Sequence, residues 1–81
     1  MTHRKIIGAN IRAARLAKGW TQEKLAMRAK LNSDYLSTLE RGLVNVSVDA
    51  LVRIGKVLGI SLADIVGVAG PAPSSEAREN K

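Results

Sequence analysis

Cysteine is absent from the 81-residue sequence, which excludes disulfide bonds, thiolate chemistry and cysteine-ligated zinc. No run of about 18 apolar residues occurs, and Met1–Lys5 leads into no apolar stretch of signal-peptide length. The chain also lacks the length for more than one domain with a modest core, which leaves no room for a deep catalytic cleft. We therefore expect one small, soluble, cytoplasmic domain.

Acidic residues are scarce in one half of the chain only. Residues 1–42 contain nine Lys or Arg against three Asp or Glu, whereas residues 43–81 contain four of each kind. The whole net charge of +6 therefore lies in the N-terminal half, as expected if that half faces a polyanion such as nucleic acid. A basic surface that only keeps the protein soluble is the alternative.

The sequence shows no alternation of apolar and polar residues, no hairpin signal and no internal repeat, and its apolar spacing is helical throughout. Most of the apolar segments begin behind a capping residue, and several end at a glycine. These signals predict five helices, over about residues 5–18, 22–29, 33–41, 48–58 and 62–66, and hence an all-α bundle in a domain of residues 1–69. Residues 70–81, GPAPSSEARENK, have no large apolar side chain and are expected to form a disordered tail.

Only three residues separate the second and third of these helices, so the two must meet at a sharp corner. Ala26 allows a close approach there, and Leu31 is expected to point inward from the turn. The apolar positions of this segment fit a helix-turn-helix over about residues 22–39: Leu25, Ala26, Ala29, Leu31, Leu36 and Leu39. A generic pair of antiparallel helices is the alternative that spacing leaves open.

The segment GANIRAARLAKGWTQEKLAMRAKLNSDYLSTLERG resembles the helix-turn-helix family of phage repressors and Cro, often called the XRE family. The resemblance covers about residues 7–66, and ERGLVNVSVDAL is most similar to the controller proteins of restriction-modification systems. It implies a five-helix, lambda-repressor-like domain that binds double-stranded DNA. It also implies a transcriptional regulator that represses or activates by blocking or contacting RNA polymerase.

Family resemblance assigns phosphate contacts to two places. Gln22 opens the second helix, where the family grips a phosphate with a Gln amide and backbone N–H groups, and Thr21 precedes it. Arg41 and Asn45 flank Gly42 where the third helix passes into the following loop, and relatives also contact phosphates there. That loop is unusually apolar here, and a plain first-turn glutamine is the alternative for Gln22.

Base reading is expected from the exposed positions of the third helix: Ser33, Asp34, Tyr35, Ser37 and Thr38. The first four exposed positions include no Arg, Gln or Asn, which are the strongest bidentate readers of bases. DNA shape and phosphate contacts are therefore expected to supply more of the selectivity. For Asp34, a role as a helix-dipole or capping acid is the alternative.

Three further positions have roles implied by the family. Arg15 and Glu40 match an ion pair that locks the first helix to the third. Trp20 matches a large apolar core residue, with base stacking as the alternative. Lys30 stands where the turn commonly carries Gly, so a positive φ there would cost about 1 kcal/mol relative to Gly.

One recognition helix reads too few base pairs to select a site in a genome, so we expect a homodimer on a pseudo-palindromic operator. The neutral C-terminal half supplies the candidate interface, namely Ile60, Leu62, Ile65, Val66 and Val68. The alternative is that most of these side chains are buried within the monomer.

No cofactor, metal or small-molecule ligand is expected, because His3 has no partner in sequence and no second domain is available as a sensor. An enzyme is the least favoured interpretation, since no nucleophile and base are arranged together. Two competing hypotheses stay open. One is an antitoxin-like autoregulator whose main partner is another protein, and the second is a non-specific nucleic-acid binder.

Overall fold

The computed structural model describes residues 3–67, and these form five helices and no strand, as the sequence predicts. The helices are α1 (His3–Ala17), α2 (Gln22–Ala29), α3 (Ser33–Glu40), α4 (Val48–Leu58) and α5 (Leu62–Val66). The expected tail at 70–81, the end of the 1–69 domain and Val68 lie outside the described residues. None of the helices in residues 3–67 is long and apolar enough to cross a membrane.

Side-chain caps start four of the helices where the sequence predicts them. The Thr21 hydroxyl accepts from the N–H of Lys24 at 3.0 Å, and the Ser47 hydroxyl accepts from the N–H of Ala50 at 3.1 Å. Asn32 and Ser61 cap α3 and α5 in the same way. Each cap satisfies a backbone donor that the first helical turn leaves without a partner.

Three helix boundaries differ from the expectation, and one of them is the end of α1, at Ala17 instead of Lys18. α1 begins at His3 instead of Lys5, because no cap or breaker in the sequence stops the helix from extending toward the N-terminus. α3 ends at Glu40 instead of Arg41, whose φ of −86° and ψ of −1° leave the helix. Gly42 then takes a φ of +74°, a conformation that glycine adopts without the steric cost of a Cβ.

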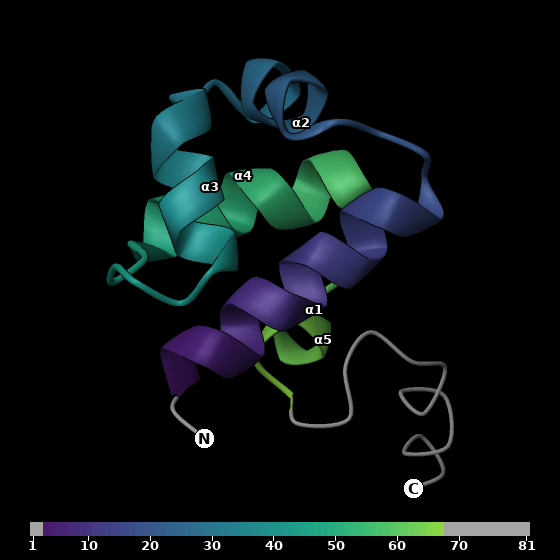
Figure 1. Cartoon of the computed structure of the whole chain (residues 1–81). Helices are drawn as coiled ribbons and strands as arrows, with labels where there is room; N and C mark the ends of the chain where they lie inside the picture. Colours follow the sequence, from purple (N-terminus) through teal and green to yellow (C-terminus); the bar gives the residue numbers. More distant parts are fainter. Residues whose placement is uncertain (1–2, 68–81) are drawn as a thin grey trace, which may run out of the picture.

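The five helices surround one core, and Figure 1 shows α1 crossing the molecule between α2 and α5. α1 packs against α3, α4 and α5, and α2 packs against α3 and α4. Six large side chains at the centre are fully buried: Ile11, Leu25, Leu36, Leu39, Ile54 and Ile65. Trp20 packs against this core while it stays partly exposed.

The corner between α2 and α3 has the geometry that the helix-turn-helix spacing predicts. Lys30 has a φ of 59° and a ψ of 46°, so it adopts the left-handed conformation that glycine favours. The N–H of Leu31 donates to the carbonyl of Ala26 at 2.8 Å, and the Leu31 side chain packs against the core. The turn therefore ends α2 and redirects the chain into α3 within three residues.

Two residues of α1 hold α3 and α5 against this helix, and the sequence alone indicates neither contact. A Cβ on Gly8 would lie only 2.6 Å from the carbonyl oxygen of Glu40, so glycine allows α1 to touch the end of α3. The buried Asn10 side chain donates to the carbonyls of Ile65 and Gly67 at 2.6 and 2.7 Å. Asn10 thereby holds the carboxyl end of α5 against α1.

Candidate nucleic-acid interface

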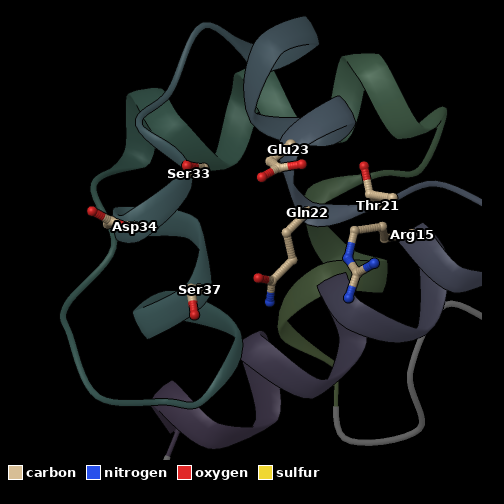
Figure 2. A pocket seen from close by; sticks show the side chains of 7 residues that line it. All are labelled: Arg15, Thr21, Gln22, Glu23, Ser33, Asp34 and Ser37. Atoms are coloured by element: carbon tan, nitrogen blue, oxygen red, sulfur yellow. The ribbon is translucent and has the colours of Figure 1, made fainter.

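An open hollow lies where the amino-terminal turns of α2 and α3 approach each other. We call it the α2–α3 hollow; its volume is about 480 Å³, and it is lined by Arg15, Thr21, Gln22, Glu23, Ser33, Asp34 and Ser37. Figure 2 shows the α3 side chains on one side and the others opposite, with the Gln22 amide between them. The hollow therefore unites residues predicted to contact phosphates with residues predicted to read bases.

One lining residue of this hollow, Arg15, belongs to a buried ion pair with Glu40. Glu40 accepts from Arg15 Nε at 2.7 Å and from Nη2 at 2.9 Å, so the contact is bidentate. The exposed fractions of the two side chains are only 8% and 1%. Arg15 Nη1 also donates to the carbonyl of Trp20 at 2.7 Å. One network thus joins α1, the α1–α2 connection and α3.

Gln22 belongs to the same network. Its Nε2 donates to Glu40 Oε1 at 3.1 Å, which orients the amide at the start of α2. An amide nitrogen carries two N–H donors, so one remains to meet an anion at this helix terminus. The α2 backbone N–H groups and the helix dipole favour an anion at the same place. No pattern in the sequence indicates that Glu40 holds Gln22 as well as Arg15.

The five candidate base-reading residues of α3 divide into two groups by their exposure. Ser33 and Asp34 are exposed, whereas Tyr35, Ser37 and Thr38 are half-buried. The Thr38 hydroxyl donates to the carbonyl of Tyr35 at 2.8 Å, which uses its one donor and leaves its oxygen as an acceptor beside the methyl group. Asn32 Oδ1 accepts from the N–H groups of Asp34 and Tyr35, so Asn32 is the cap of α3 and Asp34 is not.

A second hollow extends the basic surface at the other end of α3. It has a volume of about 570 Å³ and is lined by His3, Arg4, Lys5, Gly42 and Asn45. Arg41 and Asn45 are both exposed in this region. Sequence reasoning did not single out Arg4 or Lys5, and the charge excess of the N-terminal half was the only signal that pointed to them.

One candidate interface residue needs correction. Ile65 is fully buried inside the monomer, between α1 and α4, and has no surface to offer a partner. Leu62 and Val66 are 42% and 46% exposed, and Ile60 is half-buried. The exposed fractions place Ile65 on the inner side of α5 and leave Leu62 and Val66 partly open to solvent. Val68 lies outside the described residues.

No group of three or more His, Cys, Asp or Glu side chains within residues 3–67 is placed to hold a metal ion. Three titratable side chains line the α2–α3 hollow. Arg15 is held in the ion pair with Glu40, and Glu23 and Asp34 are exposed.

A sequence profile described as helix-turn-helix matches residues 11–65, which reaches every helix. The chain belongs to this helix-turn-helix family of transcriptional regulators. This helix-turn-helix regulator is 37% identical over 73 residues to an uncharacterised HTH-type transcriptional regulator, y4dJ, of Sinorhizobium fredii, covering 90% of this chain and 95% of the relative. It is 41% identical over 64 residues to the control protein C.BamHI of Bacillus amyloliquefaciens, covering 78% and 79% of the two chains.

Solved structures agree with this assignment. The clp gene regulator ClgR of Corynebacterium glutamicum matches the helix-turn-helix regulator with a TM-score of 0.80 and 36% identity, covering 99% of this chain and 86% of the other. The restriction-modification controller protein C.AhdI of Aeromonas hydrophila matches with a TM-score of 0.74 and 32% identity, covering 76% and 94%. The expected family is therefore confirmed, and these relatives are named as regulators or controller proteins.

Proposed function

We propose that this regulator binds a pseudo-palindromic DNA operator as a homodimer, with α3 in the major groove of each half-site. The observation that carries the proposal is the α2–α3 hollow, which unites an oriented Gln22 amide at the start of α2 with the exposed start of α3. Phosphate contacts fix the register of such a domain, and the adjacent helix then reads base edges.

Base reading in this proposal falls to Ser33, Asp34, Tyr35, Ser37 and the methyl group of Thr38. Hydroxyl groups pair with several bases, Asp34 can accept from a cytosine amino group, and a methyl group suits thymine. These are weaker discriminators than bidentate Arg or Asn contacts. Sequence-dependent DNA shape therefore supplies a larger share of specificity at this interface.

Phosphate binding falls to Thr21 and Gln22 on one side of α3 and to Arg41 and Asn45 on the other. Both pairs adjoin hollows that open to solvent, and Arg41 and Asn45 are exposed. Contacts on both sides of the recognition helix hold it across the groove. The net charge of +6, with its excess in the N-terminal half, supports attraction to DNA.

Dimerisation in this proposal uses the outer face of α5. Leu62 and Val66 are exposed apolar residues there, next to a small hollow of about 220 Å³ to which Ile60, Leu62 and Val52 contribute. Exposed apolar side chains beside an apolar hollow are typical of a self-association surface. Similarity to proteins named as restriction-modification controllers supports the same subgroup for this chain, and regulation of such a gene pair is its proposed setting.

Selection of binding sequences from random duplex DNA tests the proposal. We expect recovery of an inverted repeat whose half-sites lie about one helical turn apart. Operator affinity should then fall steeply with salt, because each phosphate contact releases counterions. Equal affinity for selected and random DNA would instead indicate a non-specific binder, and recovery of no repeat would contradict the dimeric mode.

A pair of charge variants then tests the placement of the interface. Arg41→Gln is expected to weaken binding to all sequences alike and to lower the salt slope by about 0.9. Lys56→Gln removes the same charge from an exposed position of α4, outside both hollows, and serves as the matched control. Equal effects of the two substitutions would show that only total charge matters.

A further inference from the structure

A set of exposed cations runs from the end of α1 across α2 to α4, and we call it the basic strip. Its members are Lys18, Lys24, Arg28, Lys30, Arg53 and Lys56, all of them exposed. None of the six lies on α3, and none lines the α2–α3 hollow. The basic strip is therefore a second positively charged surface, separate from the proposed DNA interface.

Trp20 organises one end of the basic strip. Lys18 Nζ lies 5.3 Å, Lys24 Nζ 5.5 Å and the Arg28 guanidinium 5.1 Å from the centroid of its ring. Each cation is attracted to the ring, but the three repel one another. Within residues 3–67 none of them has an ion-pair partner. An anion placed here is attracted by all three charges and relieves their repulsion.

The other end of the basic strip is a hollow of about 360 Å³ between α2 and α4. Four cations of the strip, Arg28 among them, line it together with Ala29 and Val57. Ala29 is buried and Val57 half-buried, so the hollow contains apolar surface within a cationic rim. Arg53 Nη1 donates to the carbonyl of Lys30 at 3.2 Å, which ties α4 to the α2–α3 turn.

Arg28 connects the two ends, because it lies over the Trp20 ring and also lines the hollow. A ligand for the whole strip must therefore offer several negative charges and at least one apolar group. Duplex DNA offers phosphates but no apolar side chain for Val57 and Ala29. An acidic segment in which Asp or Glu alternates with Leu or Val offers both.

We propose that the basic strip is a docking surface for an acidic, amphipathic segment of a partner protein, and that this segment binds while α3 lies in the major groove of DNA. The charge complementarity of the strip and the apolar surface in its hollow identify the partner's chemistry. Docking of the partner is additional to the operator-binding role and does not depend on it, whereas simultaneous binding of partner and DNA rests on the proposed function.

A labelled synthetic peptide of alternating Glu and Leu, titrated with the full chain, tests the proposal, and a peptide of alternating Gln and Leu is the control. Binding is read from fluorescence anisotropy and from emission of Trp20, the one tryptophan in the sequence. We expect the Glu peptide to bind and to change Trp20 emission, and the Gln peptide to do neither. Equal binding of both peptides, or no binding of the Glu peptide, would overturn the proposal.

Substitutions locate the binding surface. Arg28→Gln is expected to lower the affinity for the Glu peptide about threefold. The double variant Arg28→Gln with Lys56→Gln is expected to lower it about tenfold, as suits exposed charge pairs. Arg12→Gln, an exposed cation of α1 outside the strip, is the matched control and should leave binding unchanged. Circular dichroism establishes that each variant is folded. Equal affinities for all variants would place the peptide elsewhere and overturn the proposal.

The final arm uses the protein bound to its selected operator. The peptide is expected to bind this complex as it binds the free protein, without releasing the DNA. Duplexes that extend beyond the operator provide the opposite test. If they release the peptide, and if the extra DNA raises affinity only while Arg28 is present, the strip binds flanking DNA and the proposal is overturned. Failure to find any operator would contradict the proposed function but would leave the free-protein titration decisive for the strip.

Discussion

Substitution of Glu40 by Gln removes one charge and almost no volume from the network that Glu40 forms with Arg15 and Gln22. In the native protein Glu40 accepts three hydrogen bonds, two from Arg15 at 2.7 and 2.9 Å and one from Gln22 at 3.1 Å. The substitution leaves the Arg15 guanidinium charged, with an exposed side-chain fraction of only 8%. A buried charge without a counter-charge is among the most costly defects in a folded protein.

The expected loss is large relative to the stability of the chain. Removing one partner of a buried ion pair costs about 3–5 kcal/mol. A chain of 81 residues has a free energy of unfolding of about 4–12 kcal/mol in total. Since each kcal/mol shifts the Tm of a domain this size by about 4–8 °C, the Tm should fall by at least about 12 °C.

Urea unfolding followed by circular dichroism and by Trp20 emission measures this loss. Glu23→Gln is the matched control, because Glu23 is an exposed acid of α2 and should change stability by less than about 0.5 kcal/mol. The double variant Arg15→Met with Glu40→Leu replaces both charges by apolar groups and should regain about half of the loss or more. If the free energy of unfolding of Glu40→Gln lies within about 0.5 kcal/mol of the native value, the ion pair does not stabilise the fold.

Four further outcomes are expected. Lys30→Gly should raise stability by about 1 kcal/mol in urea unfolding, because it removes a side chain from a left-handed residue, whereas Lys30→Ala should not. Gly8→Ala should lower the Tm, since the new Cβ would meet the backbone of Glu40, and an unchanged Tm would contradict the close approach of α1 and α3. Asn10→Ala should cost about 1–3 kcal/mol, because the carbonyls of Ile65 and Gly67 at the end of α5 lose their donor; hydrogen exchange should report the loosening near α5 first. Leu62→Glu should turn dimers into monomers in sedimentation equilibrium. The fold should persist, since an acid suits the first turn of α5, and a dimer that survives would place the interface elsewhere.

Local signals explain why the helices were predictable. Caps such as Thr21 and Ser47 act within one turn of the chain, so the sequence contains both the capping residue and the backbone groups that it satisfies. Family resemblance drew attention to Lys30, because the turn commonly carries Gly there, and the structure gives this residue a φ of 59°. The ends of α1 and α3 were each misplaced by one residue, since helix ends fray and the last residue is the least sharply defined part of a helix.

Contacts between distant segments explain what was missed in the candidate site. The hydrogen bond between Gln22 and Glu40 joins residues eighteen apart, and the position of Gln22 at a helix start does not reveal it. Arg4 and Lys5 approach Asn45 only because α1 packs beside the end of α3. Apolar character placed Ile65 among the interface residues, but only the packed structure distinguishes the inner face of α5 from its outer face.

By itself, the sequence determined the helical class, the corner between α2 and α3 and, through family resemblance, the type of regulator. These follow from short-range spacing, capping and an uneven distribution of charge, all of which are properties of neighbouring residues. The tertiary structure alone decided that one carboxylate holds both Arg15 and Gln22, and that six cations from α2, α4 and the connections on either side of α2 form one basic strip. Such arrangements depend on how the helices pack, because only packing brings side chains that are far apart in the chain within reach of one another.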